Sequence, residues 1–313
     1  MKRQPSVSIV IPFFNEERGI GLLLKNIEQY SSQRKFEFDI IFVDDGSNDH
    51  TSEIIRHYQS SPFPCKLIKL SNNFGSHAAI RAGFLHSTGD LVTFLPADLQ
   101  ISFDTLERLY NAALEGNDIV YGIREINETG MFEKTFSRFY ASIMRQFVNK
   151  DFPYKGLETV MINEKVRTIF NENVESNSSF VLQLLSMGFK NKFVNIVKAQ
   201  RNAGKSKWTT TKKIKLLIDS FIAFSYAPIR FVTIMGILFS IIGFLWTIYI
   251  VLRTLLVGDL SPGWPALTSI LLFGFGVTNI SLGIIAEYLW RTLDASRKRP
   301  VFIIDEIIEL NNL

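Results

Sequence analysis

The sequence predicts an α/β domain with a mostly parallel sheet, followed by interfacial helices and a hairpin of two transmembrane helices. Three observations predict this organisation. Short apolar segments alternate with helical patterns up to about residue 205, two long C-terminal runs carry no charge, and basic residues flank those runs. The chain has 313 residues, 47% of them hydrophobic and 20% charged, and this length allows about two structural units.

The composition excludes several classes of protein. The single cysteine, Cys65, rules out an internal disulfide and a thiolate cluster for zinc. The 27 phenylalanines are too many for a disordered chain. A net charge of +4 is too small to indicate nucleic-acid binding without a dense basic stripe, so we expect no nucleic-acid partner.

Strands and helices alternate in the N-terminal region. Apolar runs rich in β-branched residues predict strands, and apolar residues three or four positions apart predict helices. On this basis the strands are 7–13, 38–43, 65–70, 90–95 and 118–121, and the helices are 16–30, 49–58, 76–85 and 103–114. This alternation predicts a largely parallel sheet with helices on both faces, which binds ligands beyond the carboxyl ends of its strands.

Polar residues follow four of these strands. They are Asn15 and Glu16, Asp44 and Asp45, Asn72 and Asn73, and Asp98 and Gln100. A single Asp or Asn at such a place is equally explained as a turn residue or a helix cap. Four strand ends in succession instead indicate a polar crevice with at least three carboxylates. A bound cation, or the hydroxyls of a sugar and a ribose, would explain these acids in a basic chain.

Two uncharged runs are longer than the helices of a soluble core. The first is 231–252, and the second, 260–286, is helical after Pro265. Because about 20 apolar residues match the hydrocarbon thickness of a bilayer, we expect transmembrane helices at about 231–252 and 266–288. A pair of buried core helices is the alternative, although such helices are usually shorter.

Basic residues predict the orientation of the hairpin. Six lie between 205 and 230 and four between 291 and 299, whereas the connection at 253–265 holds one Arg and one Asp. Basic flanks stay on the cytoplasmic side. We therefore expect an inner-membrane protein with a cytoplasmic domain at 1–205, a juxtamembrane amphipathic region at 206–230, a membrane hairpin at 231–290 and a cytoplasmic tail at 291–313.

Two features of this membrane region have further interpretations. A plain surface helix of the soluble domain is the alternative for the amphipathic region. Glycines seven residues apart in each apolar run would allow close helix packing, within the hairpin or in a homo-oligomer such as a tetramer.

A set of short motifs resembles those of one enzyme family. The motifs are 9–17 (IVIPFFNEE), 43–47 (VDDGS), 73–75 (NFG), 89–90 (GD) and 97–100 (ADLQ). Their order and spacing are similar to family 2 glycosyltransferases with the GT-A fold, a Rossmann-like domain with a mostly parallel sheet. The segments 121–124 (YGIR) and 201–207 (RNAGKSK), with the hairpin, resemble the polyisoprenyl-phosphate glycosyltransferases of the bactoprenol glucosyltransferase and dolichyl-phosphate mannose synthase type.

The resemblance implies a site for a nucleotide-diphosphate sugar, for which we expect uridine. Pro12 and Phe14 would form an apolar shelf against the base, and Asp45 would accept from a base N–H. Core packing of Phe14 and a capped turn at the two aspartates are the alternatives. The implied nucleotide-binding residues are Pro12, Phe14, Glu16, Asp44, Asp45, Ala97 and Asp98.

The resemblance also implies a divalent cation, Mg²⁺ or Mn²⁺, bound by Asp98 and Gln100. Such a cation would stabilise the charge that develops on the departing diphosphate. The family commonly reads DADLQ here, whereas this chain has Pro96 in place of the first Asp, so one carboxylate ligand is missing. Mg²⁺ is also held by one carboxylate together with substrate phosphates and waters.

The implied acceptor is a polyisoprenyl phosphate at the cytoplasmic membrane face. The residues implied to bind phosphates are Arg124, Arg138, Arg201, Ser206 and Lys207, and those implied to act in catalysis are Asp98, Arg124 and Arg201. Attraction of the basic run to anionic headgroups is the alternative. The segment 156–159 (GLET) replaces the GDFR of many relatives, so the sugar is not implied. The product would serve cell-surface glycan synthesis, with a flippase and a second glycosyltransferase downstream.

Two other functions stay open at this point. A family 2 enzyme with a hydroxyl acceptor would need a catalytic base, for which Glu158 and Glu175 are the candidates. A phosphate acceptor needs none, because its second pKa is about 6. A non-catalytic membrane protein that binds nucleotide sugars is the other alternative, and Pro96 favours it.

Overall fold

A computed structural model describes most of the chain in two units. The described residues are 3–33, 35–58, 63–98, 101–124, 157–173, 180–196, 263–296 and 300–310, with shorter pieces between 138 and 153 and between 231 and 256. One unit comprises Met1–Ser220 with Pro300–Leu313, and the other comprises Phe221–Arg299. The predicted juxtamembrane region at 206–230 lies outside the described residues.

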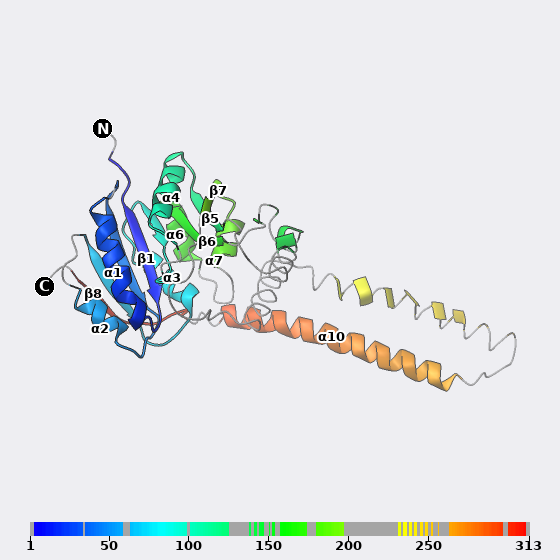
Figure 1. The fold of residues 1–313 in the computed structure, drawn as a ribbon. Helices are drawn as coiled ribbons and strands as arrows, with labels where there is room; N and C mark the ends of the chain where they lie inside the picture. The colour runs from blue at the N-terminus through cyan, green and yellow to red at the C-terminus, as the bar shows by residue number, and fades with distance from the viewer. Residues whose placement is uncertain are drawn as a thin grey trace. The chain divides into compact units, whose positions relative to one another are not determined.

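The described part of the first unit is built on an eight-stranded sheet in the order β7-β5-β6-β4-β1-β2-β3-β8 (Figure 1). The strands are β1 (Val7–Phe13), β2 (Phe38–Asp44), β3 (Cys65–Leu70), β4 (Leu91–Phe94), β5 (Ile119–Arg124), β6 (Leu157–Asn163), β7 (Asn191–Ile196) and β8 (Ile304–Glu309). Strands β6 and β8 run antiparallel to their neighbours, and the other six run parallel to one another. The predicted mostly parallel sheet is therefore confirmed.

Helices cover both faces of this sheet. One face carries α1 (Glu17–Ser31), α2 (Thr51–Arg56) and α4 (Asp104–Leu114), whose apolar residues form one core with alternate residues of β1 and β2. The opposite face carries α3 (Ser76–Leu85), α6 (Glu164–Glu172) and α7 (Phe180–Ser186). A Cβ on Gly83 would lie 2.2 Å from Cγ1 of Val10, so α3 packs against β1 only because this residue is glycine.

The predicted elements agree with the structure up to residue 124. All five strands and four helices are present, and their ends differ from the predicted ones by no more than three residues. Sequence reasoning missed β6, α6, α7 and β7, which lie in the region of weakest resemblance. It also missed β8, because residues 291–313 were predicted only as a cytoplasmic tail. The structure corrects this interpretation: residues 304–309 of the tail form an edge strand of the sheet.

The second unit contains α10 (Trp264–Ser296) and short helical pieces between 231 and 256. Among the residues that the structure describes, no helix combines the length and apolarity needed to cross a membrane. The hairpin predicted at 231–252 and 266–288 is therefore not seen and stays a prediction.

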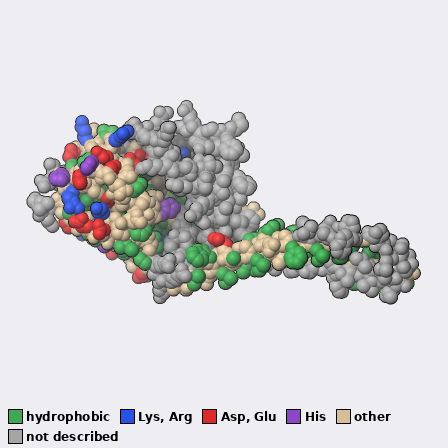
Figure 2. Space-filling view, turned by 90° about the horizontal axis from the view of Figure 1, so that it is seen from below, with side chains coloured by type: hydrophobic (Ala, Val, Ile, Leu, Met, Phe, Trp, Pro, Cys, Tyr) green, Lys and Arg blue, Asp and Glu red, His purple; other side chains and the backbone are tan. Residues whose placement is uncertain are grey.

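Large apolar side chains are exposed along this second unit (Figure 2). Examples are Phe231, Trp246, Leu271, Phe275 and Trp290, each with about half or more of its surface accessible. Monomeric soluble proteins rarely expose so many large apolar side chains together, and such surfaces usually contact another protein or a membrane.

Candidate functional site

The loops that follow β1 and β2 are joined by hydrogen bonds. The backbone N–H of Asn15 donates to Ser47 Oγ at 3.0 Å, and the N–H of Asn48 donates to Asn15 Oδ1 at 2.9 Å. Asn15 has a φ of 51°, a left-handed conformation that Asn adopts more readily than most residues. The N–H of Glu16 donates to Thr51 Oγ1 at the start of α2. The two loops therefore form one structural unit at the carboxyl edge of the sheet.

Asp44 is fully buried at the end of β2. Its Oδ1 accepts from the backbone N–H of Ser47 at 2.8 Å, and its Oδ2 accepts from the hydroxyl of Ser52. This arrangement is the capped turn that was the alternative interpretation of the aspartate pair. Asp44 shapes its own loop, and its contact with a nucleotide stays a prediction.

Asp45 connects the loop after β2 to the loop after β3. Its Oδ1 accepts from the N–H of Phe74 at 2.8 Å, and its Oδ2 accepts from the N–H of Gly75 at 2.9 Å. Burial raises the pKa of this carboxyl group, as does the neighbouring charge of Asp44, and the two amide hydrogen bonds oppose that rise. Asp45 thereby orients the NFG loop, and its contact with a base stays a prediction.

Gly46 lies at a close approach between the loops that follow β2 and β3. Its φ is +74°, and a Cβ at this position would lie 2.5 Å from the carbonyl carbon of Asn72. Both the backbone conformation and the close approach require glycine. The glycine of the VDDGS motif therefore brings the loops after β2 and β3 together.

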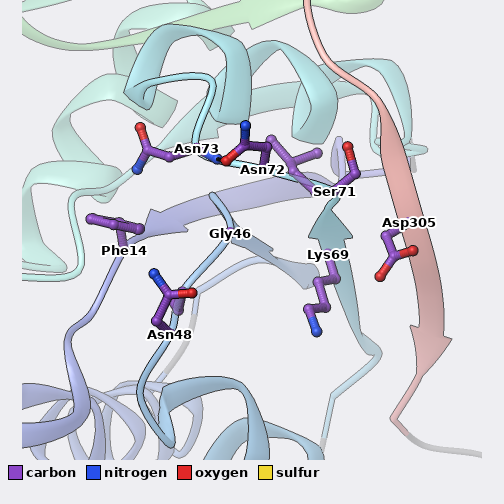
Figure 3. Close-up of a pocket in the computed structure, with 10 residues that line it drawn as sticks. Phe14, Gly46, Asn48, Lys69, Ser71, Asn72, Asn73 and Asp305 are labelled. Atoms are coloured by element: carbon purple, nitrogen blue, oxygen red, sulfur yellow. Dashed lines mark hydrogen bonds between the residues drawn. The ribbon is translucent and has the colours of Figure 1, made fainter.

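A pocket of about 260 Å³ opens beside these loops (Figure 3). Phe14 lies at one end, and Lys69 and Asp305 lie at the other. The lining residues are Phe14, Gly46, Ser47, Asn48, Lys69, Leu70, Ser71, Asn72, Asn73 and Asp305. One aromatic ring among many hydrogen-bonding groups suits a ligand with a flat face and a polar edge, such as a nucleoside.

Asp98 follows β4, which is the neighbour of β1 on the side away from β2. The side chain is half-buried, whereas that of Ala97 is buried in the core. Within the described ranges no group of three His, Cys, Asp or Glu residues could hold a metal ion. A single Asp still fits Mg²⁺ or Mn²⁺, because these ions accept one carboxylate when phosphates and waters complete their coordination. Gln100, the second predicted ligand, lies outside the described residues.

Arg124 forms an ion pair with Glu158 across β5 and β6. Its Nε donates to Glu158 Oε1 at 2.7 Å, and a terminal guanidinium nitrogen contacts the same oxygen. The two side chains are 34% and 12% exposed, so the pair is partly shielded from water. The carboxylate orients the guanidinium, and the charge of Glu158, a candidate base, is engaged by the arginine.

The other predicted phosphate-binding residues are less well defined. Arg138 is exposed on a short helical piece. Arg201, Ser206 and Lys207 lie outside the described residues, as does Glu175. Pro12, within β1, is half-buried and lies two residues before the pocket residue Phe14. The structure thus brings the described residues of the four predicted strand ends, from Asn15 to Asp98, to one edge of the sheet, and the assigned roles stay predictions.

Two charged pocket residues, Lys69 and Asp305, were missed by sequence reasoning. Lys69 lies inside a predicted strand, and Asp305 lies in the predicted tail. The only signal for Asp305 was the run 301–308 (VFIIDEII), whose β-branched and aromatic residues are typical of a strand.

The chain is similar to known proteins along most of its length. Residues 8–171 match the family described as Glycosyl transferase family 2. The chain is 30% identical to the undecaprenyl-phosphate 4-deoxy-4-formamido-L-arabinose transferase of Edwardsiella ictaluri, over 97% of this chain and 95% of the relative. It is 31% identical to the bactoprenol glucosyl transferase of Shigella phage SfV, over 95% of this chain and 97% of the relative.

One similar solved structure is the mannosyltransferase PcManGT from Pyrobaculum calidifontis in complex with GDP-Man and Mn²⁺. It aligns with a TM-score of 0.46 at 14% identity, over 90% of this chain and 88% of that one.

Proposed function

The chain belongs to glycosyl transferase family 2, and on that premise we propose that it transfers a sugar from a nucleotide-diphosphate sugar to a polyisoprenyl phosphate. It is a glycosyltransferase by family. Two relatives of similar length are named as an undecaprenyl-phosphate transferase and a bactoprenol transferase, which supports a lipid phosphate as the acceptor. The family match also favours an enzyme over the non-catalytic alternative.

The polar pocket at the ends of β1, β2 and β3 is the observation that supports a nucleotide-diphosphate sugar as the donor. The ring of Phe14 would face the nucleobase, and the loops held by Asp44 and Asp45 would surround the nucleoside. Since β4 lies next to β1, a diphosphate extending from this pocket would reach the position of Asp98. Mg²⁺ or Mn²⁺ bound there would stabilise the negative charge of the leaving diphosphate.

The acceptor phosphate would attack the anomeric carbon opposite the diphosphate. A bond forms between a phosphate oxygen and that carbon while the bond to the diphosphate breaks, and the configuration inverts. With a second pKa of about 6, the lipid phosphate is already mainly a dianion and needs no base. The protein therefore contributes positioning and charge stabilisation. Arg124, oriented by Glu158, would bind phosphate oxygens together with Arg201 and Lys207.

A hydroxyl acceptor would instead require a general base. Glu158, one of the two candidates, already forms an ion pair with Arg124, an arrangement that suits orientation of the guanidinium. This contact favours the phosphate acceptor over the hydroxyl alternative.

We propose that residues 231–252 and 266–288 anchor the enzyme in the inner membrane, with both termini in the cytoplasm. The uncharged runs, their basic flanks and the exposed apolar side chains of this unit support the proposal. The acceptor would then be reached from the cytoplasmic leaflet. A homo-oligomer, and transfer of the product to a flippase and a second glycosyltransferase, are further proposals.

The test uses purified full-length protein and a panel of labelled nucleotide sugars. Short-chain polyisoprenyl phosphate is the acceptor, and the free polyisoprenol is its matched control. We expect label in the lipid only with the phosphate acceptor, and we expect the transfer to stop on chelation of divalent cations. Equal transfer to polyisoprenol would contradict the assignment of a phosphate acceptor. Full activity under chelation would contradict the proposed divalent cation, and no transfer from any donor would refute the function.

A further inference from the structure

Strand β8 carries one extra residue at the edge of the pocket. It pairs antiparallel with β3, so that Lys69 lies opposite Glu306, but the next residue, Leu70, lies opposite Ile304. Asp305 is therefore skipped in the pairing. Such a bulge turns a side chain away from the regular alternation, often beside a binding site. Here the skipped residue lines the pocket (Figure 3).

The strand that carries Asp305 is firmly held on the domain. Arg56 of α2 forms an ion pair with Glu306 at 2.7 Å, and Lys66 of β3 forms one with Glu309 at 3.4 Å. Backbone hydrogen bonds extend the pairing beyond both ends of the strand. Leu310 is buried in the core of the first unit. Asp305 consequently has a defined place in the pocket wall, although it lies outside every motif.

Asp305 and Lys69 bring opposite charges to the same end of the pocket. In the described part of the chain, neither side chain forms an ion pair. Asp305 is exposed and Lys69 is half-buried, so both are accessible to a ligand. A carboxylate only accepts hydrogen bonds and an ammonium only donates them. Together they suit a ligand edge on which an N–H and a carbonyl are neighbours.

The strand order indicates which part of the donor would reach this end. From β4 to β8 the order is β4-β1-β2-β3-β8, and strands lie about 4.8 Å apart, so β8 is about 19 Å across the sheet from β4. The diphosphate and the reacting sugar are assigned to the β4 side, near Asp98. The part of the donor farthest from the reaction, the nucleobase, would therefore lie between Phe14 and Asp305.

We propose that Asp305 and Lys69 recognise the edge of the donor nucleobase, an inference that rests on the proposed function. Asp305 accepts from the ring N–H in place of Asp45, whose two oxygens already accept from the N–H groups of Phe74 and Gly75. Lys69 donates to the adjacent carbonyl. Uracil and guanine carry a ring N–H next to a carbonyl. Adenine and cytosine have a bare ring nitrogen at the corresponding position, which faces a carboxylate unfavourably. The pair thus selects a uridine or guanosine donor.

The experiment measures the affinity of purified full-length protein for UDP, GDP, ADP and CDP by competition. The variant is Asp305→Asn, and the matched control is Glu309→Gln, which removes a carboxylate from the same strand outside the pocket. We expect the wild type to prefer UDP or GDP. In Asp305→Asn the affinity for that nucleotide should fall about tenfold or more, with little change for ADP and CDP. The control should behave as the wild type.

Several outcomes would overturn the inference. An unchanged preference in Asp305→Asn would do so, and so would an equal loss for all four nucleotides, which indicates a change of pocket shape. If Asp305→Asn does not fold, Lys69→Gln tests the same edge and should show the same selective loss. If the wild type transfers sugar but the variants keep its nucleotide preference, the inference about Asp305 and Lys69 is wrong and the proposed function stands. A wild type that binds none of the four and transfers nothing refutes both.

Discussion

Acids occupy two kinds of place along the carboxyl edge of the sheet. Asp44 and Asp45 are buried, and their oxygens accept hydrogen bonds from the loops around them. Asp98 is half-buried and Asp305 is exposed, the latter at the wall of the pocket. The acids of the most recognisable motif thus build the loops, whereas acids at more exposed places are better situated to meet a ligand.

The largest expected effect belongs to the half-buried acid Asp98. We expect Asp98→Asn to reduce sugar transfer about 10²–10³-fold, because the cation that would stabilise the leaving diphosphate loses its carboxylate ligand. The free energy of unfolding should change less than in Asp45→Ala, because Asn keeps the shape of the half-buried side chain. Initial rates with a labelled donor and a urea titration measure both quantities. Asp104→Asn, an exposed acid on α4, is the control. Retention of most of the turnover would end the assigned role.

For the buried acid Asp45 the main expected effect is on the free energy of unfolding. Asp45→Ala leaves the N–H groups of Phe74 and Gly75 without their acceptor, so we expect a loss of about 1–3 kcal/mol in the free energy of unfolding. Chemical denaturation of the detergent-purified protein measures it. If Asp45→Ala were as stable as Asp98→Asn, the distinction between loop-building and more exposed acids would not hold.

A smaller effect is expected at the ion pair of Arg124 and Glu158. Because both side chains keep some contact with water, we expect a coupling free energy of about 1 kcal/mol between Arg124→Gln and Glu158→Gln. A double-mutant cycle of unfolding free energies measures this coupling. Additive effects of the two substitutions would mean that the carboxylate does not hold the guanidinium in place.

The smallest effect is a dependence of stability on pH at His77. Its ring packs edge-on against Phe180 at 5.2 Å, and burial, with the nearby charge of Arg81, lowers its pKa below 6.5. The unfolded chain therefore binds a proton at a higher pH than the folded one. The resulting stability is present above pH 6.5 and is lost as the pH falls from 6.5 through the folded pKa.

Substitution of His77 by Gln should remove this part of the dependence. The matched comparison is His50, whose pKa is raised by its hydrogen bond to Glu53 and which should act with the opposite sign. Its contribution is present below pH 6.5 and is lost as the pH rises through the folded pKa. Unfolding of the wild type, His77→Gln and His50→Gln is measured from about pH 5 to about pH 8. Identical pH profiles for His77→Gln and the wild type would contradict the assignment.

The sequence predicted the first half of the sheet well because each element there is specified locally. The strands β1 to β5 are rich in apolar, often β-branched residues, and the helices between them have clear periodicity. In β6 and β7 polar residues interrupt the apolar ones, as in LETVMIN and NKFVNI, so the local pattern is weak. Strand β8 pairs with a strand more than 200 residues earlier, and no local pattern contains that information.

The residues of the candidate site likewise fall into those that local sequence patterns predict and those that depend on long-range contacts. Motif residues such as Phe14, Asp45 and Asp98 were placed correctly at the carboxyl edge, because strand order and loop position follow from the α/β alternation. The hydrogen bonds of Asp44 and Asp45 depend on close contact between loops, which the sequence does not specify locally. The capped turn could therefore be predicted only as an alternative interpretation. Asp305 reaches the pocket through long-range pairing and a bulge, which no motif encodes.

The course of the chain through β8 has a practical consequence for soluble versions of the enzyme. A truncation that ends before the apolar unit would discard residues 300–313, strip the last strand from the sheet and leave the backbone of β3 as an unpaired edge. Such an edge invites aggregation. Joining residue 220 to residue 300 through a flexible linker would delete the second unit and keep β8. This internal deletion variant is the form to prepare for crystallisation with a nucleotide.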